Sequence, residues 1–492
     1  MPQEAHRSLL LRNARIGTAG PVGSLLITGG RVAAIAPDPP DVAADEVVDA
    51  QGRTVLPGLW DAHVHIVQWV SARRRVDLSG AGSAREAAGL LAARRTGSNE
   101  RLIGFGFRDG LWPDRPTPEL LDWAGDNQVV LLVSKDLHTV WLNRAALRAL
   151  GYPDDHSGVL REQPCIDAVA QLTYVAPEES DRWIADAQRA AAARGVVGFI
   201  DFEYADNIAD WRRRVSAETA TRVVATVYPA YLDNAIADGL RTGDEVPGTE
   251  GSVTVGNLKI FVDGSLNTRT ALCRDAYPDL ISGPNAHGLL ETAPDVLERL
   301  MTEAHRAGIE PAVHAIGDRA NSIALDAFER VGCPGRIEHA QLIEQRDLPR
   351  FARPGLVLGV QPAHLVDDRD VAERHWAGRT HRAFAYADLL AAGARLEFGS
   401  DAPVSPMDPW HSIAAAVRRT GGDRRPWHPE QAIDLAAALA ASSRGRRRIE
   451  VGDIADLVLV DVDPAQAPLD ELAQMPVAAT LLAGRWTFRR DG

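Results

Sequence analysis

The sequence predicts an α/β protein built on a parallel sheet, and three observations lead to that prediction. Short apolar runs of strand length recur through the middle of the chain. Segments with helical spacing follow these runs, and strands that alternate with helices indicate βαβ units. Near both ends of the chain, other strand-like runs are separated by glycine, proline and asparagine turn signals.

Composition narrows the classes of partner. The 492 residues include 67 acidic and 53 basic side chains, and a formal charge of −14 argues against nucleic acid or an anionic membrane as the main partner. The three cysteines, Cys165, Cys273 and Cys333, are far apart, so neither a disulfide framework nor a thiolate metal site is indicated. No apolar run approaches the roughly 20 residues of a membrane helix. We therefore expect a cytoplasmic protein.

The two ends of the chain are expected to form one small sheet domain. Residues 8 to about 56 are rich in strand signals, and residues 453–463 and 478–490 show the same strand pattern. We assign residues 1–56 and 447–492 to this domain, and residues 57–446 to the part between them.

The central part contains eight apolar runs, and eight parallel strands close a barrel. The runs are residues 54–65, 195–202, 221–229, 255–263, 308–315, 335–340, 355–362 and 394–401. Segments with helical spacing fill gaps between them, for example residues 181–194, 294–308 and 381–393. More than a hundred residues separate the first two runs. An inserted subdomain of mixed α and β structure is therefore expected at about residues 70–190.

Residues able to bind cations stand at or near the ends of five of the eight runs. They are His63 and His65, Lys259, His314, His339 and Asp401. The carboxyl ends of barrel strands converge on one face, so these side chains can meet although they are far apart in the sequence. The two histidines of the H-x-H pair point to the same side of a strand. Imidazole and carboxylate ligands without cysteine predict an open site for one or two divalent ions, with Zn²⁺ favoured over Mn²⁺, Co²⁺ or Fe²⁺.

Lysine is almost absent from this chain. Only Lys135 and Lys259 occur among the 53 basic residues, and Lys259 lies in an apolar run where a cation is costly to bury. A deprotonated lysine can react with CO₂ to give a carbamate, an anionic ligand that bridges two metals. Arginine stays protonated and cannot do this. The alternative is that Lys259 reaches solvent or pairs with Asp263; for Lys135 there is no comparable chemical argument.

Motifs along nearly the whole chain resemble the amidohydrolase superfamily, and within it the YtcJ-like branch that includes N-substituted formamide deformylases. In the barrel part they are "LPGLWDAHVH", "LKIFVDGSLNTRTA", "AVHAIGDRA", "RIEHAQL" and "FGSDAPVSPMDP", and in the insertion "LWPDRPTPELLD", "SKDLHTVWLN" and "SGVLRE". H-x-H or "GSDAP" alone is a weak signal, but five barrel motifs in series are highly specific.

The resemblance implies a distorted (β/α)₈ barrel beside a small β-sandwich made from both termini. It also implies that the metal-site residues are His63, His65, Lys259, His314, His339 and Asp401, with Lys259 carboxylated. Two features depart from the family pattern. The segment between "LAAALAASSRG" and "VGDIADLVLVD" is shorter than usual, and "DFEYAD" replaces a more typical His-Asp ending on the second strand.

The reaction we expect is hydrolysis of an amide-type C–N bond by a metal-activated hydroxide, with Asp401 accepting and later delivering the proton. His138 and His364 are candidates to orient a small-molecule substrate, or else they make local hydrogen bonds in loops. Formamides, other N-acyl compounds and cyclic amides all remain open as substrates, as does homo-oligomerisation. One rival is a mononuclear deaminase of a heterocyclic base, which has no need for Lys259. A second rival is a binding protein on a retired enzyme scaffold.

Overall fold

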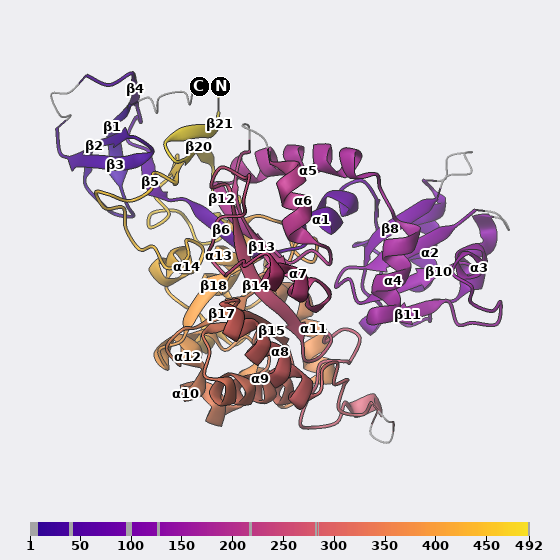
Figure 1. Ribbon diagram of the computed structural model, residues 1–492. Helices are drawn as coiled ribbons and strands as arrows, with labels where there is room; N and C mark the ends of the chain where they lie inside the picture. Colours follow the sequence, from indigo (N-terminus) through magenta and orange to yellow (C-terminus); the bar gives the residue numbers. More distant parts are fainter. Residues whose placement is uncertain are drawn as a thin grey trace.

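The computed structural model describes residues 8–38, 43–94, 101–124, 128–215, 219–280, 283 and 285–490. The first seven and last two residues, which the sequence assigned to the terminal sheet domain, lie outside this description. Figure 1 shows a barrel in the middle of the molecule. A sheet made from both chain ends lies at the upper left, and the inserted subdomain lies at the right.

The barrel is a sheet of eight parallel strands, and all eight predicted runs contribute to it. In sheet order the strands are β6 (Leu59–Val64), β12 (Val196–Asp201), β13 (Arg222–Val227), β14 (Val253–Phe261), β15 (Pro311–Ala315), β16 (Gly335–His339), β17 (Leu356–Val360) and β18 (Arg395–Phe398). The two edges approach each other just after β18, where Val64 forms a bridge with Ala402 and the Asp401 N–H donates to the His63 carbonyl at 2.7 Å. The predicted α/β barrel is confirmed.

Helices cover the outside of the barrel, so its strands are buried on both faces and read as apolar runs. They are α1 (Ile66–Ala72), α5 (Pro177–Ala192), α6 (Asn207–Arg214), α7 (Leu232–Ala237), α8 (Pro294–Ala307), α9 (Asp318–Val331), α10 (Leu348–Phe351), α11 (His364–His375), α12 (Tyr386–Ala391), α13 (Pro409–Arg418) and α14 (Leu435–Ala441). Helix α8 is followed by a capping glycine, Gly308, with φ 85°.

One predicted helix is shorter than expected. Helical spacing runs through residues 381–393, but α12 starts only at Tyr386. Phe384 takes a left-handed backbone conformation, φ 52°, and its N–H donates to the Gln341 carbonyl at 2.7 Å. A long-range contact therefore overrides the local helical preference at this point.

Strands from both ends of the chain share one sheet of mixed direction. Its order is β21 (Arg485–Arg489), β20 (Val477–Leu482), β19 (Leu457–Val460), β5 (Thr54–Pro57), β1 (Leu9–Ile16), β2 (Val22–Thr28) and β3 (Arg31–Ala36), with β4 (Glu46–Asp49) paired to β1. The two ends join where β5 and β19 run antiparallel, with Val55 opposite Leu459. Since β6 begins directly after β5, this sheet anchors the start of the barrel.

The insertion between β6 and β12 carries a five-stranded sheet of its own. In order the strands are β11 (Val159–Arg161), β10 (Thr139–Leu142), β9 (Val130–Ser134), β8 (Leu102–Phe107) and β7 (Val76–Asp77), with helices α2 (Ala84–Ala92), α3 (Arg144–Ala149) and α4 (Gln163–Leu172). Among the described residues, no helix is long and apolar enough to cross a membrane.

Candidate metal centre and substrate cavity

The side chains predicted from the strand ends meet in one cavity of about 430 Å³. It is lined by all six predicted metal-site residues and by both predicted substrate-orienting histidines: His63, His65, Lys259, His314, His339, Asp401, His138 and His364. Convergence of the carboxyl ends of parallel strands accounts for this gathering.

Asp401 is the shared member of two groups of side chains that could each hold a cation. One group is His63, His65 and Asp401, and the other is His339, His364 and Asp401; in each, the candidate ligand atoms lie within 4.8 Å of one another. Asp401 Oδ1 is 3.2 Å from His65 Nε2 and 3.6 Å from His63 Nε2, whereas Oδ2 is 3.9 Å from His364 Nε2. Each carboxylate oxygen thus faces a different histidine group.

The donor atoms of this cluster fit a divalent cation. His63 Nε2, His339 Nδ1 and His364 Nε2 are buried and have no hydrogen-bond partner. Buried polar atoms without partners are rare, because each loses its hydration and gains nothing in return. A metal ion satisfies such nitrogens directly, and an imidazole and carboxylate set suits Zn²⁺.

His63 is oriented by charged side chains inside the barrel. Its Nδ1 lies 2.7 Å from Glu338 Oε2, so an ionised Glu338 accepts the Nδ1 proton and leaves the Nε2 lone pair for the cavity. Glu338 also accepts from Arg336 Nε at 2.7 Å, and Arg336 Nη1 donates to Glu397 Oε2 at 2.6 Å. The sequence analysis missed Glu338. Its signal was the alternation of Arg336 and Glu338 on an otherwise apolar strand, which turns both toward the same side.

Gly359 gives these charged side chains the room they occupy. It lies on β17, between β16 and β18, and a Cβ atom placed there would be 2.1 Å from Glu338 Oε2 and 2.7 Å from Arg336 Nη2. The Arg336 and Glu338 side chains therefore pass over a strand that has no side chain at this position.

Lys259 is buried beneath two aromatic rings. It is 1% exposed, and Nζ lies 4.5 Å from the ring centroid of Phe202 and 4.9 Å from that of Phe261. Burial lowers the pKa of Lys259 to about 8, although Glu338 and Asp401 act in the opposite direction. A substantial fraction of a lysine with this pKa is a neutral amine near pH 7 to 8.

The expected alternative for Lys259, an ion pair with Asp263, does not form within the described part of the chain. Asp263 instead accepts backbone N–H groups from Leu272, Ile316 and Gly317, at 2.8, 3.0 and 2.8 Å. The other lysine, Lys135, forms an ion pair with Asp367. Lys135 therefore has a structural partner, and Lys259 has none among the described carboxylates.

His314 lies beside the cluster but faces another atom. Its ring centroid is 4.4 Å from that of His339, while its Nε2 is 3.4 Å from the Gly264 carbonyl and 3.7 Å from Asp263 Oδ1. It belongs to neither of the two close groups that contain Asp401. His364, which the sequence assigned to substrate, belongs to one of those two groups instead.

Two of the candidate ligands sit on strained backbone. His339 has φ 78° and Asp401 has φ 55°, both in the left-handed region that side chains other than glycine rarely adopt. Such conformations cost about 1–3 kcal/mol each and persist where the surrounding structure imposes them, often at functional sites. At Asp401 the hydrogen bond from its N–H to the His63 carbonyl helps to hold this conformation.

His138 enters the cavity from the inserted subdomain, in the turn before β10. Its Nδ1 is hydrogen-bonded to Glu162, which also accepts from Thr268 Oγ1 at 2.9 Å and Thr270 Oγ1 at 2.6 Å. Burial lowers the pKa of His138, but the charge and hydrogen bond of Glu162 outweigh it and raise the value to about 9. His138 is therefore a cation at neutral pH. The sequence analysis missed the role of Glu162, although this residue ends the quoted "SGVLRE" motif.

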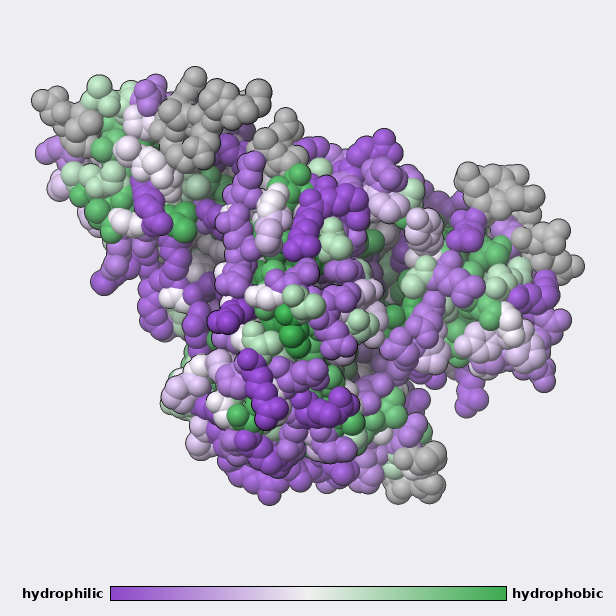
Figure 2. All heavy atoms as spheres, viewed as in Figure 1, coloured by the Kyte–Doolittle hydropathy of each residue, from purple (hydrophilic) through white to green (hydrophobic). Residues whose placement is uncertain are grey.

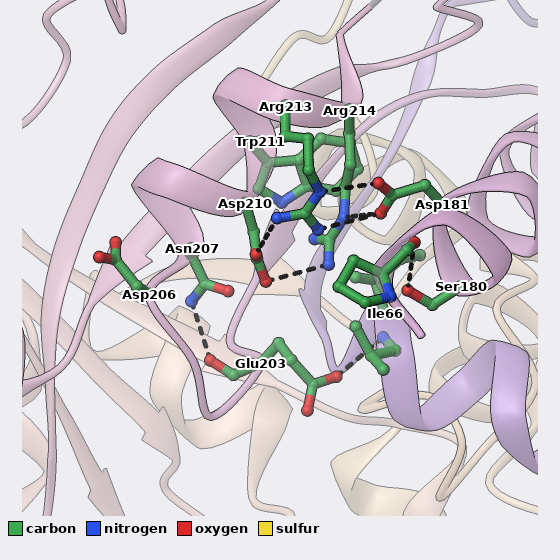
Figure 3. Close-up of polar contacts among 12 residues, drawn as sticks. Ile66, Ser180, Asp181, Glu203, Asp206, Asn207, Asp210, Trp211, Arg213 and Arg214 are labelled. Carbon is green, nitrogen blue, oxygen red and sulfur yellow. Dashed lines mark hydrogen bonds and ion pairs between the residues drawn. The ribbon is translucent and has the colours of Figure 1, made fainter. Parts of the chain in front are cut away.

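The unusual ending of the second strand supplies packing and a helix contact. Phe202 stacks on the His63 ring at 4.1 Å, and Glu203 Oε2 accepts from the N–H groups of Val67 and Gln68 at 2.8 and 3.0 Å. Figure 3 shows Glu203 below the α6 side chains, next to the start of α1. This segment therefore places an aromatic ring beside His63.

Comparison with protein families identifies the family of this chain. The model of the amidohydrolase family matches residues 46–488, which is most of the chain. The protein belongs to the amidohydrolase family. It is accordingly a hydrolase, and the resemblance stated from its motifs is confirmed.

Individual relatives within the amidohydrolase family agree. The chain is 28% identical to the putative amidohydrolase YtcJ of Bacillus subtilis (strain 168), over 91% of each chain. It is 27% identical to the N-substituted formamide deformylase of Arthrobacter pascens, over 99% of each. The crystal structure of an uncharacterised metal-dependent hydrolase from Pyrococcus horikoshii OT3 superposes with a TM-score of 0.77 at 28% identity, covering 94% of this chain and 99% of that one.

Replacing Gly359 with alanine tests the packing of the charged barrel interior. We expect Gly359→Ala to lower the free energy of unfolding by about 1–3 kcal/mol, because the new methyl group overlaps Glu338. Urea unfolding measures the change. Gly89→Ala is the control, since Gly89 lies in α2 and a Cβ there meets no atom within 4 Å. Equal unfolding midpoints for Gly359→Ala and the wild type would contradict this assignment.

Proposed function

We propose that this amidohydrolase uses divalent metal to hydrolyse a C–N bond in an amide, a formamide or a cyclic amide. The observation that carries the proposal is the position of Asp401, whose two oxygens face two histidine groups in one cavity. The relative named N-substituted formamide deformylase supports this reaction class. The metal-dependent hydrolase of similar fold supports a metal requirement.

The donors proposed to hold the metal are those predicted from the sequence: His63, His65, Lys259, His314, His339 and Asp401. Zn²⁺ suits them best, as one or two ions. A divalent cation bound there supplies two effects, a lower pKa for water in contact with it and polarisation of the substrate carbonyl. His364 lies close enough to Asp401 to contact either the cation or the substrate.

Asp401 is the proposed proton carrier. Burial opposes its ionisation, but the neighbouring His63 and His65 hold the pKa of its carboxyl well below the usual range. An ionised Asp401 can accept a proton from the attacking water and deliver it to the nitrogen that leaves. The proton thus moves within the cavity, without a group from outside.

Lys259 is proposed to react with CO₂. Its neutral amine attacks the carbon of CO₂, an N–C bond forms as one C=O electron pair moves to oxygen, and the amine proton passes to solvent, which leaves a carbamate anion. Burial beside Phe202 and Phe261, together with the lack of an ion pair among the described residues, favours the neutral amine that this step needs. The carbamate would supply the negative charge that a lysine ammonium cannot.

His138 and His364 are proposed to orient the substrate. With its Nδ1 held by Glu162, a protonated His138 keeps its Nε2–H as a donor on the cavity side. His364 lines the same cavity next to Asp401.

The function is tested by screening metal-loaded protein against N-substituted formamides, other N-acyl compounds and cyclic amides, with and without bicarbonate. We expect hydrolysis of one class, loss of activity after exhaustive chelation and recovery with Zn²⁺. Undiminished turnover without metal would make the proposal wrong. About two ions per chain favours a lysine-bridged site, whereas one ion with deamination of heterocyclic bases favours the mononuclear rival. Full metal loading with no hydrolysis of any compound favours the binding protein.

Asp401→Asn tests the proton carrier. An amide keeps a metal-binding oxygen but cannot accept the proton, so we expect most of the bound metal to remain while kcat falls about 100- to 10,000-fold. Metal content and steady-state kinetics are measured on the same sample. The control is Asp423→Asn, an exposed aspartate that does not line the cavity. A near-normal kcat in Asp401→Asn would remove Asp401 from this role.

The carbamate has an internal control, because the chain has only two lysines. After incubation with ¹³C-bicarbonate we expect a ¹³C NMR carbamate signal in the wild type and in Lys135→Arg. Lys259→Arg should lack the signal and should lose metal, since arginine cannot form the anion. The assignment fails if the signal survives in Lys259→Arg or never forms in metal-loaded wild type.

A further inference from the structure

The cavity that contains the candidate metal ligands is also lined by three arginines at the edge of the barrel. Arg75 follows α1, and Arg213 and Arg214 end α6. The α4 residues Ile166 and Val169 of the inserted subdomain line the same cavity. Figure 2 shows the surface hollowed where the barrel meets this subdomain. Any substrate that reaches the metal cluster therefore shares its space with this cationic edge.

Two of these arginines are neutralised by aspartates. Arg213 Nε and Nη1 bond to Asp181 and Asp210 at 2.8 and 2.7 Å. Arg214 Nε and Nη2 bond to the same two carboxylates at 2.9 and 3.0 Å. Figure 3 shows this arrangement, with Asp181 and Asp210 on either side of the paired guanidinium groups. One atom of this pair has no partner. Arg214 Nη1 is buried without a hydrogen bond, and the side chain is only 4% exposed.

Arg75 has no such neutralisation. In the part of the chain that the structure describes, its guanidinium forms no ion pair and no hydrogen bond, although the residue is partly buried. The carboxylate that acts on it most is Glu203, and both Glu203 oxygens are already engaged by the N–H groups of Val67 and Gln68 and by the Gln68 amide. Arg75 thus presents five unengaged N–H donors and a positive charge to a partly desolvated cavity.

We propose that Arg75 binds a carboxylate on the substrate. A guanidinium pairs with a planar carboxylate through two parallel hydrogen bonds, and partial burial strengthens that pairing. Apolar side chains, among them Val67, Ile166, Val169 and Phe261, also line the cavity. The substrate class is therefore an amide-type compound with a short apolar body and a carboxylate at the end away from the scissile C–N bond. This inference rests on the proposed function for the reaction, and on Arg75 for the carboxylate.

The test compares two probes that differ only in charge, N-formyl-4-aminobenzoate and N-formyl-4-aminobenzamide. For the wild type we expect kcat/KM to favour the carboxylate by roughly tenfold to a hundredfold, as for a hydrogen-bonded charge pair. Arg75→Gln should abolish that preference and leave the neutral probe nearly unchanged, while Arg75→Lys should keep part of it. Arg73→Gln is the matched control, because Arg73 is exposed and packs over Trp69 at 5.1 Å outside the cavity lining. A carboxylate preference that survives in Arg75→Gln, or a wild type that prefers the neutral probe, overturns the proposal.

A binding measurement separates this inference from the reaction. Calorimetric titration of 4-aminobenzoate into metal-free protein requires no hydrolysis and no cation. Binding that weakens at least tenfold in Arg75→Gln but not in Arg73→Gln supports the carboxylate site even if neither probe is cleaved. Equal binding by the wild type and Arg75→Gln, or no binding to either, overturns the site, whatever the outcome of the hydrolysis screen.

Discussion

A chain of buried charges inside the barrel is the constraint on which the site depends. Arg336 is shared between Glu338 and Glu397, and Glu338 in turn holds the ring of His63. Removing charges from water is costly, so an arrangement of this kind persists only when every member is paired. Each member here has a partner in the interior, and the last link turns His63 Nε2 toward Asp401. The structure thus uses its core to aim a ligand, and Gly359 is the position that leaves the space for it.

The scarcity of lysine acquires a physical meaning in this setting. Arginine serves nearly everywhere a surface cation is needed, and Lys135 occupies an ion pair that an arginine could also make. Lys259 differs because it is buried against aromatic rings and has no paired carboxylate among the described residues. A guanidinium could not lose its charge there. An amine can, and the same burial that disfavours its ammonium form favours an anionic adduct next to cations.

The sequence was sufficient for the features that depend on chain direction and periodicity. All eight strand runs could be recognised from their apolar pattern. The rule that the carboxyl ends of barrel strands converge then predicts that His63, Lys259 and Asp401 share one cavity. The features it missed depend on contacts between distant segments. Glu338 and Glu162 acquire their roles from the histidines they meet, and the early break before α12 comes from the contact of Phe384 with Gln341. No local pattern records such a pairing. His364 is a further example, because the sequence could assign it to the substrate cavity but could not place it beside Asp401.

Two parts of the chain line the cavity and contribute different kinds of side chain. The barrel supplies the proposed metal donors and proton carrier, on strands or at strand ends, and Glu338 holds the His63 ring from the interior. Other parts of the wall come from the inserted subdomain and from the α1, α5 and α6 regions, which contribute His138, apolar surface and Arg75. Side chains on those segments lie on other elements than Asp401, Arg336 and Glu338, and hydrogen bonds such as Thr268–Glu162 and Ile66–Asp201 join the two parts. The carboxylate preference proposed for this chain thus rests on Arg75, which has no ion-pair partner among the described residues.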